Sequence, residues 1–135
     1  MIRFRQFRRF SYSVFFLLVA FFQPAGAEIP DAVIDAIRTG NSSQLAAYFN
    51  PSLTLAILDK EDIYTRQQAE LIMKDFFARN VPSSFTVLHK GGKEGSQFAI
   101  GNLVTTGNVF RVTVYLKVKD NKSLIHQLRF EKDGE

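Results

Sequence analysis

The side chains that could do acid–base chemistry here are few, because the sequence contains two His and no Cys. The two imidazoles, His89 and His126, each lie in a segment where apolar and polar residues alternate. Asp59 directly follows an apolar run, so its carboxylate could face a cavity at the end of a strand. With the hydroxyls of Tyr48 and Tyr64, these groups predict either a general acid–base pair or the polar lining of a ligand pocket.

Strand alternation places three polar side chains on faces that otherwise hold apolar residues. The predicted faces join His126 with Leu124, Leu128 and Phe130, His89 with Phe85 and Val87, and Asn102 with Phe98 and Ile100. A lone polar residue on such a face is commonly a core or rim residue with one local hydrogen bond. A general acid or base also needs a partner that sets its pKa, and no carboxylate is predicted on these faces. We therefore assign no catalytic residue and predict a candidate cavity lined by Tyr48, Tyr64, His89, Asn102, His126 and Asp59.

Two further clusters of residues do not fit a metal or nucleotide site. The acidic group that begins at Asp59 favours a solvated turn before a helix, and Tyr64 stands where a calcium loop needs Gly. Gly91, Gly92 and Gly95 link two strands rather than opening a helix, so they do not predict a phosphate cradle. Without Cys there is no thiolate ligand or nucleophile, and we expect no cofactor and no metal.

Hydrophobic periodicity divides the chain into helices followed by strands. A helix is predicted from Pro30 to Gly40, and a second, capped near Asn41, runs to Asn50. Thr65 and Gln68 form a capping box for a third helix that ends at Asn80. The predicted strands are 53–58 before that helix, then 84–89, 98–106, 110–118 and 124–130 after it. This order predicts an α+β domain in which a curved antiparallel sheet wraps the third helix.

One strand shows the clearest separation of faces. Phe110, Val112, Val114, Leu116 and Val118 are predicted to point inward. The outward residues form an amphipathic stripe that continues on the neighbouring strand: Arg111, Thr113, Tyr115 and Lys117, with Ile125, Gln127 and Arg129. This stripe predicts either a homodimer face, whose candidate residues are Arg111, Thr113, Tyr115, Gln127 and Arg129, or a solvated sheet surface.

The order of elements resembles the nuclear transport factor two-like (cystatin-like) superfamily of cone-shaped α+β domains. The runs 56–65, 74–77, 84–89 and 124–131 are more specific, and together they resemble a bacterial family of small exported domains of unknown function. The resemblance covers residues 28–135 and implies fold and export, with no catalytic residue to carry over. The superfamily includes isomerases, dehydratases and epoxide hydrolases as well as binding and dimerisation modules, so activity stays open.

The N-terminal segment has the pattern of a secretion signal. Four Arg precede the apolar run 14–22, and small residues at Ala25 and Ala27 predict cleavage after Ala27. The predicted organisation is therefore a signal peptide at 1–27 and one domain at 28–135, exported by the general secretory route to the periplasm or the medium. Removal of those four Arg from the 17 basic residues leaves 13 Lys and Arg against 13 Asp and Glu. Such a balance gives no reason to expect a nucleic-acid partner, nor do we expect a membrane partner after cleavage.

Two functional hypotheses remain at this point, beside a third, a purely structural role in an envelope assembly. The first is an exported, non-catalytic domain that binds a small apolar ligand or a protein partner. The second is a cofactor-independent isomerase or hydrolase that uses Asp59 or His126 with Tyr64 or Tyr48. The second hypothesis requires at least two of these groups within hydrogen-bond reach of each other in one cavity.

Overall fold

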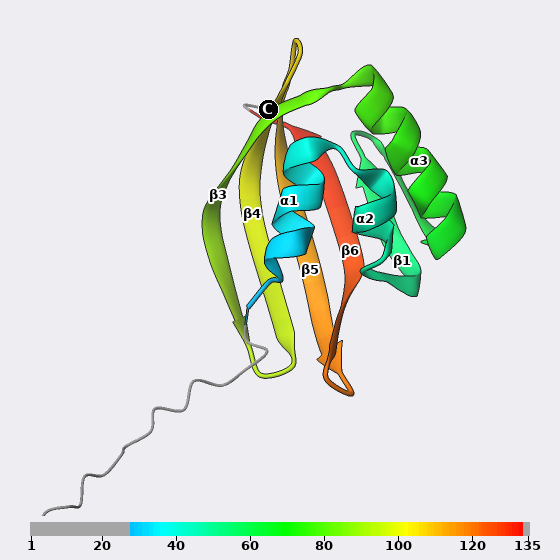
Figure 1. The fold of residues 1–135 in the computed structure, drawn as a ribbon, viewed down its shortest axis with the longest axis vertical. Coiled ribbons are helices and arrows are strands. Elements are labelled where there is room, and N and C mark those ends of the chain that lie inside the picture. Colours follow the sequence, from blue (N-terminus) through cyan, green and yellow to red (C-terminus); the bar gives the residue numbers. More distant parts are fainter. Residues whose placement is uncertain (1–27, 134–135) are drawn as a thin grey trace, which may run out of the picture.

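The computed structural model describes residues 28–133, which form three helices and one six-stranded sheet (Figure 1). The helices are α1 (Asp31–Thr39), α2 (Ser42–Ala46) and α3 (Arg66–Arg79); the strands are β1 (Phe49–Ile57), β2 (Lys60–Thr65), β3 (Pro82–Lys93), β4 (Ser96–Thr105), β5 (Val109–Lys119) and β6 (Lys122–Lys132). The strand order is β2-β1-β6-β5-β4-β3, and every neighbouring pair is antiparallel except β1 and β6. In Figure 1, α1 and α2 lie over the sheet and α3 lies beside β1. The predicted α+β fold is confirmed.

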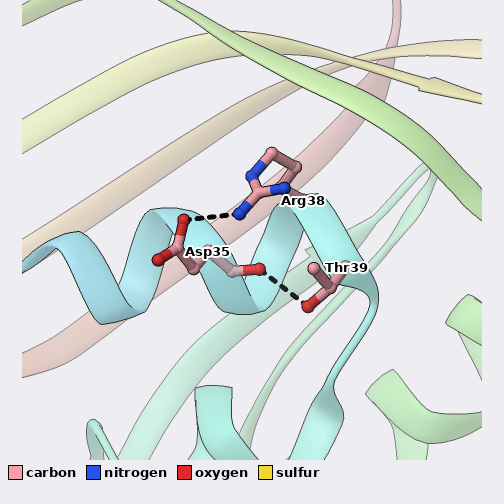
Figure 2. A network of polar contacts seen from close by, with 3 residues as sticks. All are labelled: Asp35, Arg38 and Thr39. Carbon is pink, nitrogen blue, oxygen red and sulfur yellow. Dashed lines mark hydrogen bonds and ion pairs between the residues drawn. The ribbon is translucent and has the colours of Figure 1, made fainter.

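Local signals at the helix ends act as the sequence predicts. The side chain of Thr65 accepts a hydrogen bond from the Gln68 amide at 3.2 Å, and Gln68 Oε1 accepts one from the Thr65 amide at 3.0 Å. Gly40 ends α1 with φ +69°, a conformation that costs glycine little. On the exposed side of the same helix, Arg38 donates to Asp35 at 2.8 Å and the Thr39 hydroxyl donates to the Asp35 carbonyl at 2.8 Å (Figure 2).

Four phenylalanine rings form the centre of the core between α3 and the sheet. Phe76 lies 5.2 Å from Phe110 and 4.8 Å from Phe130, measured between ring centroids. Phe77 is packed edge-on against Phe76 at 5.7 Å. The inward residues predicted for β5 are buried from Phe110 to Leu116, as expected. Aromatic side chains therefore fill the space between α3 and the sheet.

The structure adds one strand to the prediction and shortens one helix. The segment after Leu58 is not only a charged turn, because β2 begins at Lys60 and pairs with β1. Nor does the second helix run to Asn50: it ends at Ala46, and Phe49 opens β1 by pairing with Ile125. Strand pairing overrides the local pattern in both places, with the adjacent β1 at Lys60 and with the distant β6 at Phe49.

Bulges change which side chains face inward. The register of β3 shifts between Val87 and His89, so Leu88 is an extra residue and His89 pairs with the outward Ile100. The register of β6 shifts at His126, so Ile125 is fully buried instead. Each extra residue moves its successors in the strand to the opposite face.

The centre of the inner face of β4 carries the small residues Ala99 and Gly101, which corrects the expected orientation of this strand. Ala99, Gly101 and Leu103 are buried, whereas Phe98 and Ile100 lie on the outer face. A Cβ at Gly101 would meet the Phe85 ring at 2.7 Å and the Thr86 carbonyl at 2.6 Å. The Phe85 ring thus occupies the space over Gly101, and the large side chains of β4 are placed outward.

Candidate functional site

A groove of about 460 Å³ opens on the inner side of the sheet, where the β1–β2 hairpin, the end of α3 and the β4–β5 turn meet. We call it the end groove. Its volume lies within the range typical of small-ligand pockets. It is lined by Leu55, Ile57, Leu58, Lys60, Tyr64, Ile72, Asp75, Phe76, Arg79, Asn80, Asn108, Phe110 and Lys132.

The floor and walls of the end groove are apolar because they continue the core. Leu55 and Ile57 are alternate inner residues of β1, and Phe110 is an inner residue of β5. Ile72 and Phe76 are four residues apart on α3, so they share the helix face that looks toward the sheet. The same core-facing residues of β1, β5 and α3 therefore supply the apolar lining of the end groove.

Cationic side chains stand around the rim of the end groove. Lys60 is paired with Ile57, and Lys132 is paired with Phe110, so the register places both lysines on the inner side. Within residues 28–133 neither lysine has a carboxylate within ion-pair distance. Arg79, by contrast, pairs with Asp75 at 3.1 Å on the exposed side of α3. The rim therefore carries a net positive charge from two lysines.

The structure does not bring the predicted cavity residues together. Of the six, Tyr64 alone lines the end groove. Asp59 is exposed at the tip of the β1–β2 hairpin, outside the lining of the groove. Tyr48 packs partly buried against the core, and its carbonyl accepts a hydrogen bond from the Ile125 amide.

The other three lie away from the end groove, which corrects their predicted inward placement. His89 is exposed beside Phe98, with 5.6 Å between the ring centroids. Asn102 accepts a hydrogen bond from Arg111 on the outer face at 3.4 Å. His126 occupies the β6 bulge. The bulges at Leu88 and His126 and the small inner residues of β4 account for these three errors.

The chemistry available at these positions is limited. Burial, and secondarily the charge of Lys117, lowers the pKa of His126 below its ordinary value. That imidazole is therefore neutral at physiological pH, but no carboxylate among the described residues is hydrogen-bonded to it. No group of three His, Asp or Glu in residues 28–133 is arranged to hold a metal ion.

A larger hollow of about 1060 Å³ lies beside the β3–β4 and β5–β6 turns. Its charged lining is mixed, with Lys90 and Lys93 among Glu28, Glu94 and Asp120. Because these charges offset one another, the hollow does not favour a phosphate or any other anion. The end groove has an apolar lining and a net positive rim, so of these two hollows it is the better candidate for a ligand site.

Sequence reasoning missed most of the end groove. Ile72 and Phe76 lie four residues apart on α3, but this spacing does not show which residues of the helix border an opening. Lys60 and Lys132 come together with the floor only through the β2–β1–β6 pairings. The parallel β1–β6 pair joins residues far apart in sequence, and no local pattern marks it.

The predicted dimer residues do lie together on the outer face. Thr113 is paired with Arg129, and Tyr115 with Gln127, in the centre of the sheet. Arg111 forms an ion pair with Asp133 at 2.8 Å. Arg129 forms another with Glu61 at 3.0 Å, and these two side chains flank the fully buried Ala56 in the same row.

An open, curved sheet that holds three helices on its inner side defines a cone-shaped α+β domain of the nuclear transport factor two-like class. A designed NTF2-type protein shares this fold with a TM-score of 0.60, at 18% identity, over 74% of this chain and 90% of its own. More specifically, residues 30–131 match the family described as "Domain of unknown function (DUF4783)". The chain belongs to this family.

Solved members of the family cover the same domain. A DUF4783 family protein from Bacteroides ovatus is 39% identical, with a TM-score of 0.77 over 82% of this chain and 100% of its own. One from Bacteroides uniformis is 36% identical, with a TM-score of 0.76 over 80% and 100%. One from Bacteroides fragilis is 37% identical, with a TM-score of 0.74 over 78% and 99%. No protein of curated function matches the chain.

Proposed function

We propose that this protein is an exported binding domain that holds a small, mainly apolar ligand in the end groove without changing it chemically. The observation that carries the proposal is the apolar lining of the end groove, where the partly exposed Ile57 and Ile72 lie beside the buried Phe110. Burying an alkyl ligand there is favourable by about 0.8 kcal/mol for each methylene group. Tyr64 supplies a hydroxyl that can orient a polar end.

The proposal includes export by the general secretory route to the periplasm or the medium. It rests on the basic and apolar pattern of residues 1–27, which lie outside the described part of the chain. Among the described helices, none is long and apolar enough to cross a membrane.

The alternative, a cofactor-independent isomerase or hydrolase, has no observation in its favour. Its acid–base candidates were Asp59, His126, Tyr48 and Tyr64. Only Tyr64 lines the end groove, and no hydrogen bond joins any two of the four within residues 28–133. A hydroxyl alone does not provide the paired groups that proton transfer requires.

A series of straight-chain alcohols tests the proposed ligand class. Residues 28–135 contain the whole sheet and core, and the solved relatives fold as this domain alone, so this segment is the protein to titrate. We expect each added methylene to tighten binding by up to about fourfold until the groove is full, after which affinity levels off. Calorimetric titration measures this series. Binding that does not saturate contradicts a bounded groove. So does an affinity that keeps rising with chain length without levelling off.

We also propose that the outer sheet face binds another copy of this chain and forms a homodimer. Phe98, Ile100 and Tyr115 form a half-buried apolar strip there. Because the nearby Arg111 and Arg129 are already paired with carboxylates, two copies can approach without strong repulsion between unpaired charges.

Sedimentation of residues 28–135 at micromolar concentration tests the dimer. We expect a dimer for the natural sequence and a monomer for Ile100→Glu, because a charge in the centre of an apolar interface must be desolvated. Leu71→Glu, at an exposed position of α3 away from the outer sheet face, is the control and should leave the dimer unchanged. A natural sequence that sediments as a strict monomer removes the proposal.

A further inference from the structure

We infer that the end groove selects ligands that carry an anionic group at one end of the apolar chain, of the fatty-acid carboxylate type. This inference rests on the proposed function and adds the charge of the ligand to it. Two features of the lining carry it: the two lysines, which have no carboxylate partner among residues 28–133, and the amide of Asn108.

The strand register fixes both lysines relative to the apolar floor. Ile57 is paired with Lys60 on one side and with Phe130 on the other, and Lys132 lies two residues beyond Phe130. The lysines thus stand on either side of the point where the β1 floor ends. An alkyl chain lying on Leu55 and Ile57 would have its end between two ammonium groups. A carboxylate there gains charge-assisted hydrogen bonds, whereas an amine would meet two like charges.

The one acid of the lining does not offset this preference. Asp75 is held by Arg79, whose guanidinium lies 3.1 Å from one carboxylate oxygen and 3.2 Å from the other. The pair is internally neutral, and both of its side chains are exposed to solvent. The field at the mouth of the groove is therefore set by Lys60 and Lys132.

Three probes with the same ten-carbon chain test the inference: decanoate, decanol and decylamine, each titrated calorimetrically into residues 28–135. We expect decanoate to bind about three- to tenfold more tightly than decanol, and decylamine more weakly than both. The preference for decanoate should shrink as salt is added, because the lysines are exposed to solvent.

The double variant Lys60→Gln with Lys132→Gln is expected to bind decanoate no more tightly than decanol, because both ammonium groups of the rim are then absent. The matched control, Lys74→Gln with Lys117→Gln, removes two exposed lysines that do not line the groove and should keep the preference. Equal binding of decanoate and decanol by the natural protein overturns the inference and leaves the proposed function standing. If none of the three probes binds, the proposed function itself fails.

Discussion

Replacing Phe130 by Ala is expected to lower the free energy of unfolding by about 3–5 kcal/mol. Phe130 is fully buried, and its ring contacts Phe76 at 4.8 Å and Phe77 at 6.5 Å between centroids. Removing the ring takes away the burial of an aromatic side chain and leaves a cavity where α3 meets the sheet. The domain has no disulfide to offset such a loss. Urea unfolding of residues 28–135, followed by circular dichroism, measures the change.

Leu71→Ala is the control for this prediction. Leu71 lies on α3 but is 67% exposed, so its truncation should change the stability by less than about 0.5 kcal/mol. If Phe130→Ala also unfolds at an unchanged urea concentration, the four rings do not form the centre of the core. The space between α3 and the sheet would then not be filled by these rings.

Replacing Ile72 by Glu is expected to weaken the binding of decanol by at least about tenfold. Ile72 forms part of the apolar wall of the end groove, and a carboxylate at this position keeps water that an alkyl chain would have to displace. Glu is a good helix former, so α3 should persist. Calorimetric titration measures the affinity, and thermal unfolding checks that the domain stays folded.

The neighbouring residue provides a matched control for that change. Leu71→Glu introduces the same charge on the same helix, one residue away but on the exposed side. We expect it to leave the affinity for decanol within about twofold, because an exposed charge outside the groove is screened. Equal losses in the two variants would mean that the ligand does not contact the α3 wall of the groove.

The helices and the long strands could be predicted because their signals are local. The Thr65 capping box, the Gly40 stop and the alternation of β5 each depend on residues close in sequence, and each is confirmed. The strand β2 was missed because it is a short edge strand with exposed Lys60, Glu61 and Asp62, which reads as a solvated turn. Charged residues on an edge strand protect the sheet from further pairing. They also remove the apolar alternation by which a strand is predicted from sequence.

The candidate site was harder to predict because it depends on register. One extra residue at Leu88 and one at His126 turn the two imidazoles away from the inner face. On β4 the larger residues, Phe98 and Ile100, lie outward because the Phe85 ring covers Gly101 on the inner side. An alternation of large and small residues therefore does not by itself show which face is buried.

The position of a bound alkyl chain shows whether the end groove is the ligand site. Residues 28–135 labelled at the Ile and Leu methyl groups can be titrated with decanol and followed by nuclear magnetic resonance. We predict saturable shifts at Leu55, Ile57 and Ile72 in the end groove, and none at Ile100 on the outer face. Shifts centred on Ile100, with the groove methyls unchanged, would contradict the account.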